Sequence, residues 1–392
     1  MSHAAQQENL DWVQLLRGLA ALLVVLTHAR YALLDTPGFP LANLLFFPGA
    51  FGVDLFFLIS GFIMCYATAD SDGSRGYVAR FAVKRWSRVW PAYAVATLLA
   101  ALAMHGGLHY FSNAANRLTF LRSMALLPAD AHAVPYFAMT LLVGWTLVFE
   151  MYFYAIYGAS LLFKRLRWFA LAAWVLLTVI LLPLGKRGFE LDITRDLHYK
   201  FGYASVATSP FVLEFAAGVL IGWIYLQGWA RLRSRQVAWH VLGLGVALAA
   251  WAIYGGIAVG HGPLGYGWPL ALMVLALAIA SKTVTIRVPP VFLWLGSISY
   301  SLYLTHLISQ TLVSRAMAAL GLVGEARTWG YIFMSTAAAL SVAALSQHYL
   351  ELRLSNQVRA LLLRLLQRLP RRRRATSAQP AEPASARKAT AG

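Results

Sequence analysis

The chain alternates between long apolar runs and short polar connections. Ten of the runs are long enough to cross a bilayer, which takes about 20 mostly apolar residues in a helix. They fall at about 12–33, 46–67, 87–106, 135–163, 168–184, 208–228, 237–257, 265–281, 291–315 and 328–350. The pattern predicts an all-α polytopic membrane protein with about ten transmembrane helices in a single domain.

Composition narrows the class further. The 392 residues are 59% hydrophobic and 12% charged, more apolar surface than a soluble protein of this length can bury. The single cysteine, Cys65, excludes an internal disulfide and a cysteine-based metal cluster. Residues 1–9 are polar without a basic segment, so we expect the first apolar run to stay as a transmembrane helix rather than act as a cleaved signal.

The formal net charge of +18 is concentrated in alternate connections and in the tail. Basic residues gather around 75–88, 164–167, 231–235 and 282–287, whereas the other connections hold fewer, with 185–207 as the main exception. With an even number of spans, this bias predicts that both termini are cytoplasmic. Aromatic and basic residues are not interleaved as nucleic-acid binding requires, so we expect no nucleic-acid partner.

Three regions follow from this pattern: a cytoplasmic N-terminus at 1–9, a transmembrane domain at 10–355, and a basic tail at 356–392 that its composition predicts to be disordered. We expect Arg371–Arg374 to contact anionic membrane lipids, and no soluble domain. Two outer segments stand apart. Residues 105–135 either lie in the interface or re-enter the membrane, and 185–209 forms either a solvated connector or a contact surface for a polar acceptor such as a sugar chain.

The first run carries Arg17 near one end and His28 near the other, on either side of an almost wholly apolar stretch. Eleven residues make about three helical turns, so the two side chains share a face and are separated by roughly 16 Å along the axis. Arg17 alone is compatible with an interfacial anchor, and His28 alone with a satisfied core histidine. Together on one face they favour a polar path into the membrane.

A second candidate group is the basic cluster of Lys84, Arg85 and Arg88, next to Trp86 and Trp90. Spacings of three and four residues place the cations together at a helix start. Positive-inside anchoring explains any one of them. The dense cluster also suits a phosphorylated cofactor, with guanidinium groups on phosphates and an indole near a purine.

Further polar residues fall inside the other runs. Asp54 is expected to pair with a basic group or orient an imidazole, and Ser60 belongs to a set of small residues suited to close helix packing. Glu150 follows Trp145 in an aromatic run, where it must pair with a cation, accept a hydrogen bond from a Tyr or Trp, or be protonated. A purely structural ion pair is the alternative.

Late in the chain, Ser299, Tyr303 and His306 follow a spacing that places them on one helix face. Ordinary interhelical hydrogen bonds and contacts to substrate explain them equally well. Just past the last run, Glu351 and Arg353 are expected to form a terminal anchor or pair. No HExxH motif or cysteine cluster is present, so the sequence predicts no metal site.

Taken together, these motifs resemble those of the acyltransferase-3 family of membrane acyltransferases, in particular the stand-alone type that modifies exopolysaccharides or O-antigens. The resemblance covers about residues 10–355. It rests on Arg17 and His28, GAFGVDLFFLISGF, KRWSRVWPAY, WTLVFEMYFY, the EFAAGVLIGW stretch Glu214–Trp223, and LGSISYSLYLTH.

The resemblance implies transfer of an acyl group, usually acetyl from cytoplasmic acetyl-CoA, to a carbohydrate hydroxyl at the outer face of a bacterial inner membrane. Arg17 and His28 match the essential pair, the basic cluster matches the motif that holds the donor nucleotide, and Glu150 matches the family acid. The VFEM segment departs from the commoner Ser-Val-Glu-Glu pattern, so the role of Glu150 stays open. Asp54, Ser60, Trp145, Tyr303 and His306 are the candidate supporting residues.

The residues support the same chemistry, with a neutral His28 as the general base for the acceptor hydroxyl, or as the carrier of the acyl group. In this hypothesis Arg17 steadies the donor or the developing charge. The acceptor is expected to be a polysaccharide or its lipid-linked precursor, with no metal involved. The alternative is a transporter or flippase for a lipid-linked glycan, which would move its substrate without changing its covalent mass. A structural scaffold leaves His28 and Glu150 unexplained.

Overall fold

The computed structural model describes residues 10–368, and within this range the regular structure is helical throughout, with no strand. Nine helical segments have the length and apolar composition to cross a membrane, and Phe211–Leu226 is a shorter apolar helix. The prediction of an all-α polytopic membrane protein is therefore confirmed, and among the described residues the helices comprise nine candidate spans and one shorter apolar helix.

The helices follow the apolar runs closely. In the first half of the chain they are α2 Asp11–Ala29, α3 Phe39–Phe46, α4 Gly52–Ala67, α5 Arg75–Met104, α6 Ala114–Met124, α7 Trp145–Leu161, α8 Arg167–Val175 and α9 Leu182–Arg187. In the second half they are α10 Gly202–Ala207, α11 Phe211–Leu226, α12 Arg235–Tyr254, α13 Trp268–Ser281, α14 Pro290–Ala319, α15 Trp329–Ser346 and α16 Ser355–Arg368.

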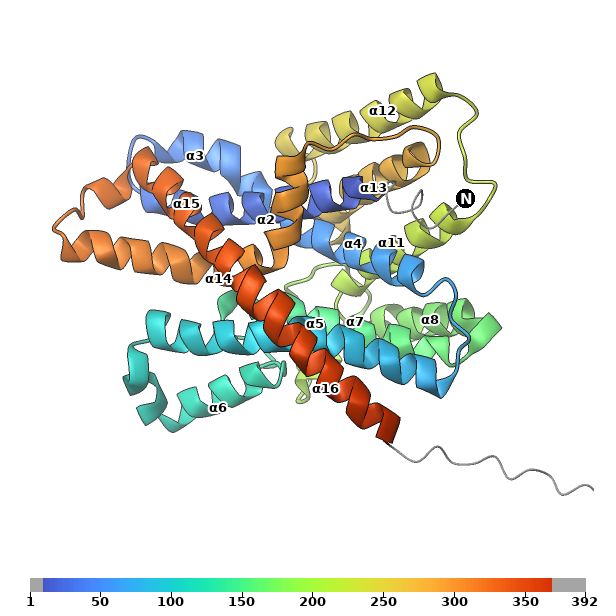
Figure 1. Cartoon of the computed structure of the whole chain (residues 1–392), viewed down its shortest axis with the longest axis horizontal. Helices are drawn as coiled ribbons and strands as arrows, with labels where there is room; N and C mark the ends of the chain where they lie inside the picture. Colours follow the sequence, from blue (N-terminus) through green and yellow to red (C-terminus); the bar gives the residue numbers. More distant parts are fainter. Residues whose placement is uncertain (1–9, 369–392) are drawn as a thin grey trace, which may run out of the picture.

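The last part of the described chain differs from the prediction. Helix α15 continues through a π-helical segment, Gln347–Leu354, into α16, and Figure 1 shows this long red diagonal crossing α5. Residues 356–368, expected to belong to a disordered tail, are thus helical. Leu362 and Leu366 are less exposed than their neighbours Leu361 and Leu365, because one side of α16 packs on α5. The rest of the predicted tail lies outside the described residues.

The connections gather at two ends of the bundle. At the first, which we call the basic end, Arg167 donates a hydrogen bond to the carbonyl of Thr68 (3.2 Å), and Arg231 donates one to the carbonyl of Lys282 (3.1 Å). At the opposite end, Arg327 donates to the carbonyl of Leu34. The connections are therefore grouped as the alternating spans predict. Which end faces the cytoplasm stays a prediction from the basic residues.

The two outer segments pack against each other at the opposite end. The first folds back beside α5 through α6, whose Leu118 and Leu121 are exposed. The second contains α10, where the Tyr203 hydroxyl donates to the carbonyl of Leu126 (2.8 Å) and Ser205 donates to the carbonyl of Ala131 (3.2 Å). Segment 185–209 thus packs against segment 105–135, whereas a freely solvated connector would make no such contacts.

Small residues allow the closest helix contacts. A Cβ atom at Gly218 of α11 would lie 2.0 Å from the backbone oxygen of Leu58 in α4, and one at Gly61 would lie 2.2 Å from the oxygen of Phe215. Because lipid gives helices no hydrophobic reason to associate, such close backbone packing is what holds them together. The expectation that the glycines of the second run serve close packing agrees with this geometry.

We predict that Gly218→Ala destabilises the protein by about 1–3 kcal/mol, because the added methyl group meets backbone atoms that cannot move independently. Thermal unfolding of the purified protein in detergent micelles measures the effect. Gly243→Ala on α12 is the matched control, since a Cβ there meets nothing within 4 Å. Equal unfolding temperatures for the two variants would contradict the proposed packing.

Candidate active site

A basic cavity of about 620 Å³ opens at the basic end of the bundle, between α2, α5, α14, the π-helical segment Gln347–Leu354 and α16. Six of its lining side chains are cationic and one, Glu351, is acidic. The cations are Arg17, Arg80, Lys84, Arg85, Arg88 and Arg359. Such an excess of positive charge around one cavity is suited to an anionic ligand with several phosphate groups.

Helix geometry explains the cluster. Arg80, Lys84 and Arg88 are spaced by four residues along α5, so they form one stripe on the helix surface. Arg17 enters from α2, where it donates a hydrogen bond to Oε1 of Gln14 (3.4 Å). The structure therefore joins Arg17 with the three predicted cations of α5. It adds Arg80, which the spacing could have indicated, and Arg359, whose place depends on the path of α16.

Glu351 also belongs to this cavity. Its carboxylate accepts a hydrogen bond from Ser301 (3.3 Å), and Arg353, its expected partner, instead lies over the ring of Tyr349. Of the two expectations, a pair or a terminal anchor, the structure does not show the pair among the described residues, because neighbours two residues apart on a helix point in different directions. The role of a terminal anchor stays a prediction. Trp86 and Trp90 stack on each other, and neither borders the cavity.

A second, inner cavity of about 210 Å³ continues from the basic one, with Gln14, Arg17, Arg85 and Arg88 lining both. Deeper in, its wall contains Glu150, whose Oε1 accepts hydrogen bonds from Tyr154 and from Ser60 (3.5 Å to the latter). Of the arrangements expected for the Glu150 carboxylate, the structure shows a hydrogen bond from a tyrosine. Ser60 acts here as a polar partner besides belonging to a closely packed helix.

His28 lies in a different cavity. Its Nδ1 is 2.9 Å from the carbonyl oxygen of Val24, which can only accept, so Nδ1 carries the proton in the neutral ring and Nε2 has a free lone pair. The cavity that His28 lines has a volume of about 650 Å³, lies at the opposite end, and also contains Gln310, Thr311 and Tyr31. We call it the histidine cavity.

His306 of α14 lies beside His28, with ring centroids 5.1 Å apart. Its Nδ1 is 2.8 Å from the carbonyl oxygen of Tyr303, and its Nε2 is buried without a hydrogen-bond partner among the described residues. The structure thus pairs two imidazoles whose Nδ1 atoms are fixed by backbone carbonyls. This arrangement favours a functional role for His306 over a simple interhelical hydrogen bond.

Rings separate the inner cavity from the histidine cavity, and the two linings share no residue. Tyr303 borders the inner cavity, packs on Phe56 (5.8 Å between centroids) and lies next to His306 (6.1 Å). Its hydroxyl is hydrogen-bonded to Oγ1 of Thr146 (2.9 Å). Arg17 and His28 therefore share a helix face, as expected, but they line separate cavities on the two sides of this barrier.

Asp54 orients an imidazole, one of the two roles expected for it. The fully buried carboxylate accepts a hydrogen bond from Nδ1 of His261 (2.6 Å) and another from the backbone N–H of Gly262 (2.8 Å). Trp145 lies against the same imidazole, with centroids 6.2 Å apart. Burial lowers the pKa of His261, but the charge and hydrogen bond of Asp54 outweigh it and raise the pKa above 6.5.

Sequence reasoning missed His261 and passed over Glu214 as a polar group. Glu214 is 2% exposed on α11, and neither carboxylate oxygen has a hydrogen-bond partner among the described residues. It lies beside Asp54 and against Gly267. An acid inside an apolar helix was itself a signal for Glu214. His261 had none, because its loop carries no other ionisable residue and meets Asp54 only in the folded chain.

The fold and these cavities define a multi-pass helical membrane protein whose polar groups converge inside the bundle. The family profile for the acyltransferase domain matches residues 10–347, and the chain belongs to the acyltransferase-3 family. The protein is therefore a membrane acyltransferase.

Two relatives are similar over most of their length. The exopolysaccharide production protein ExoZ of Rhizobium meliloti (strain 1021) is 30% identical over 289 residues, covering 74% of this chain and 85% of that protein. Nodulation protein 10 of Rhizobium leguminosarum bv. viciae is 30% identical over 381 residues, covering 91% of this chain and 97% of that protein. No solved structure gives a significant match.

The raised pKa of His261 predicts a pH-dependent contribution to stability. The contribution is fully present below pH 6.5, the ordinary pKa of histidine, and is lost as pH rises through the higher pKa of the folded state. The difference in unfolding temperature between the wild type and His261→Gln should therefore be larger at low pH than at high pH. His240→Gln, at an exposed position on α12, controls for loss of a histidine. A difference that stays constant or grows with pH would contradict the pairing.

Proposed function

We propose that the protein transfers an acetyl or other short acyl group from cytoplasmic acyl-CoA to a hydroxyl group of a surface polysaccharide or of its lipid-linked precursor. The observation that carries this proposal is the order of the groups along the bundle. A cavity lined by six cations leads into a narrower inner cavity, beyond which Tyr303, His306 and His28 follow in line.

The basic cavity suits the charged end of the donor. Coenzyme A carries phosphates that cannot enter lipid without a large desolvation cost, so they must be met at the membrane edge. Arg85 and Arg88 offer guanidinium groups to both cavities, which favours contact with the diphosphate where the chain of the donor turns inward. This placement, with the basic residues of the connections, supports a cytoplasmic location for the basic end.

The uncharged arm of the donor then follows the inner cavity. The distance from Arg17 to His28 along α2, roughly 16 Å by helical rise, is similar to the length of an extended pantetheine arm. Tyr303 and Phe56 block the way in the described conformation, so the thioester reaches the histidines only when these two rings turn aside. Arg17 lies with the cations of α5, which favours its role in steadying the donor over a role at the reacting carbonyl.

At the far end, Nε2 of His28 is the proton acceptor. It takes the proton of the acceptor hydroxyl as that oxygen attacks the thioester carbonyl carbon, the carbon–sulfur bond breaks, and the proton passes to the leaving thiolate. The products are an ester and free coenzyme A. The same free nitrogen is also suited to an acyl-histidine route, in which Nε2 first replaces sulfur on the carbonyl carbon and the hydroxyl then replaces nitrogen.

The acceptor side is supported by the relatives and by the opposite end of the bundle. The name of one relative concerns exopolysaccharide production, which favours a surface glycan as acceptor and a bacterial inner membrane as location. Tyr31 and Tyr136 are exposed aromatic residues at this end, and Arg30 lies 4.2 Å from the ring centroid of Tyr31. Flat aromatic surfaces with adjacent polar groups are suited to contact with sugar rings.

We predict that deleting the gene removes acyl groups from the surface polysaccharide of its host while leaving the glycan backbone unchanged. Mass spectrometry of the glycan measures the loss, and wild-type protein or His240→Ala should restore the groups while His28→Ala should not. If the deletion instead removes the whole glycan from the surface or leaves it inside the cell, with its mass unchanged, the result would favour a transporter for a lipid-linked glycan.

We predict that Arg88→Ala and Arg17→Ala each raise the KM for acetyl-CoA by about 10- to 100-fold, the usual loss for a charged hydrogen bond. Transfer from labelled acetyl-CoA by purified protein provides the measurement. Arg165→Ala, an exposed arginine near the same end that borders neither cavity, should leave KM unchanged. Wild-type KM values in both site variants would exclude this cavity as the donor site.

A further inference from the structure

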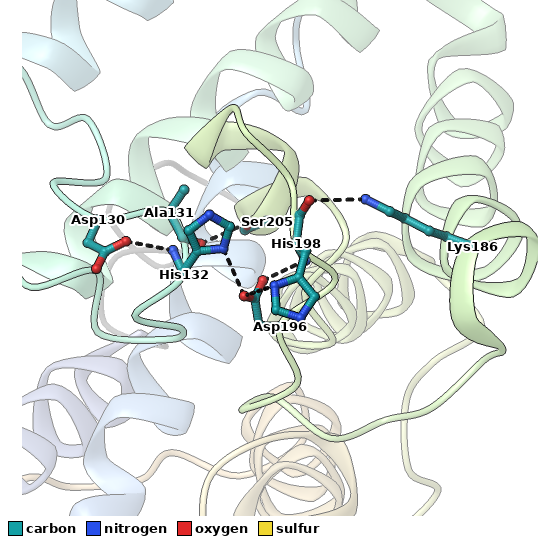
Figure 2. Close-up of polar contacts among 7 residues, drawn as sticks. All are labelled: Asp130, Ala131, His132, Lys186, Asp196, His198 and Ser205. Atoms are coloured by element: carbon teal, nitrogen blue, oxygen red, sulfur yellow. Dashed lines mark hydrogen bonds and ion pairs between the residues drawn. The ribbon is translucent and has the colours of Figure 1, made fainter.

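Two short turns with the same pattern face each other at the opposite end of the bundle. One is Asp130-Ala131-His132 and the other is Asp196-Leu197-His198. In each, the aspartate Oδ1 accepts a hydrogen bond from the backbone N–H of the histidine, at 2.9 Å for His132 and 2.7 Å for His198. Figure 2 shows how these turns direct both imidazoles toward the carboxylate of Asp196.

The three side chains converge through single atoms. Nδ1 of His132 and Nδ1 of His198 each lie 2.8 Å from Oδ2 of Asp196. All three atoms lie within 4.8 Å of one another. One carboxylate oxygen thus faces two imidazole nitrogens, an arrangement that brings three potential metal ligands around one point.

We propose that His132, Asp196 and His198 bind a divalent transition-metal ion, with Zn²⁺ as the best match. Two imidazoles and one carboxylate are a common ligand set for zinc and related ions, and ligand atoms must lie about 3 Å apart to share a metal at about 2.1 Å. The histidine side chains are 54% and 55% exposed, so an ion can enter from solvent and keep water as a further ligand.

The basic groups near this point are engaged elsewhere. The Lys186 ammonium donates to the backbone carbonyl of His198 (3.3 Å) and lies over the ring of Tyr199, and Arg195 pairs with Glu190 (2.9 Å). The Asp130 carboxylate adds a second negative charge beside His132. No local pattern in the sequence indicates the site, because His132 and Asp196 are 64 residues apart and each turn supplies at most two of the ligands.

The ion would join the two outer segments. Segment 105–135 carries His132, and Tyr136, directly after it, packs on Trp145, with centroids 5.3 Å apart. Segment 185–209 carries the other two ligands, and its Ile193 lies beside Gly262, next to His261. Metal binding would therefore fix two segments that border the Asp54–His261 pair through Trp145 and Gly262.

The test uses full-length protein purified without a polyhistidine tag, stripped with a chelator and titrated with Zn²⁺ by calorimetry. We expect one ion per chain for the wild type, and none for His132→Ala or for Asp196→Asn, which keeps an oxygen for the turn. His240→Ala, at an exposed histidine on another helix, should bind like the wild type. Zn²⁺ should also raise the unfolding temperature of the wild type and of His240→Ala but not of the site variants.

Two results would overturn the proposal. The first is the absence of saturable Zn²⁺ binding to the stripped wild-type protein. The second is unchanged stoichiometry in a His132→Ala/His198→Ala variant, which would place the bound ion elsewhere. Both substituted histidines are at exposed positions, and thermal unfolding without metal shows whether the double variant is folded.

Discussion

The close contact between α2 and α14 determines where the polar groups of this protein meet. A Cβ at Gly296 would lie 2.3 Å from the backbone oxygen of Gln14, and one at Gly18 would lie 2.8 Å from the backbone nitrogen of Gly296. Farther along, Gln310 donates a hydrogen bond to the carbonyl of Val25 (3.0 Å). With both ends of the contact fixed, His28 is held beside His306 and Arg17 is held at the mouth of the inner cavity.

The low polarity of the membrane explains how the charges are distributed. The cations of the basic cavity lie where water or an anionic ligand can reach them, because an isolated charge in an apolar interior is too costly. Buried acids are instead compensated locally, as Asp54 is by His261 and Gly262. Glu214, whose carboxylate oxygens have no geometric hydrogen-bond partner among the described residues, is the exception.

The sequence predicted the elements well because each helix leaves its own local pattern. Apolar length located the spans, and spacings of three and four residues located the cations of α5 and the pair Tyr303 and His306. Contacts between distant segments left no such pattern. The pairing of Asp54 with His261 joins residues 207 positions apart, and the entry of Arg359 into the basic cavity depends on the crossing of α16 over α5. Both contacts become visible only in the folded chain, because the residues that make them are far apart in the sequence.

The barrier between the inner cavity and the histidine cavity prevents an open polar channel across the membrane. A polar channel that stayed open from the basic cavity to the histidines would let water and ions pass and would expose a thioester to hydrolysis. Tyr303 blocks it with an aromatic ring whose hydroxyl is satisfied by Thr146, so the closed position costs no unpaired polar group. Turning that ring breaks its hydrogen bonds to Thr146 and to the carbonyl of Val143, together with its packing on Phe56. Under the proposed function, the binding energy of a donor held by several cations would offset this cost and would couple opening of the barrier to the presence of the donor.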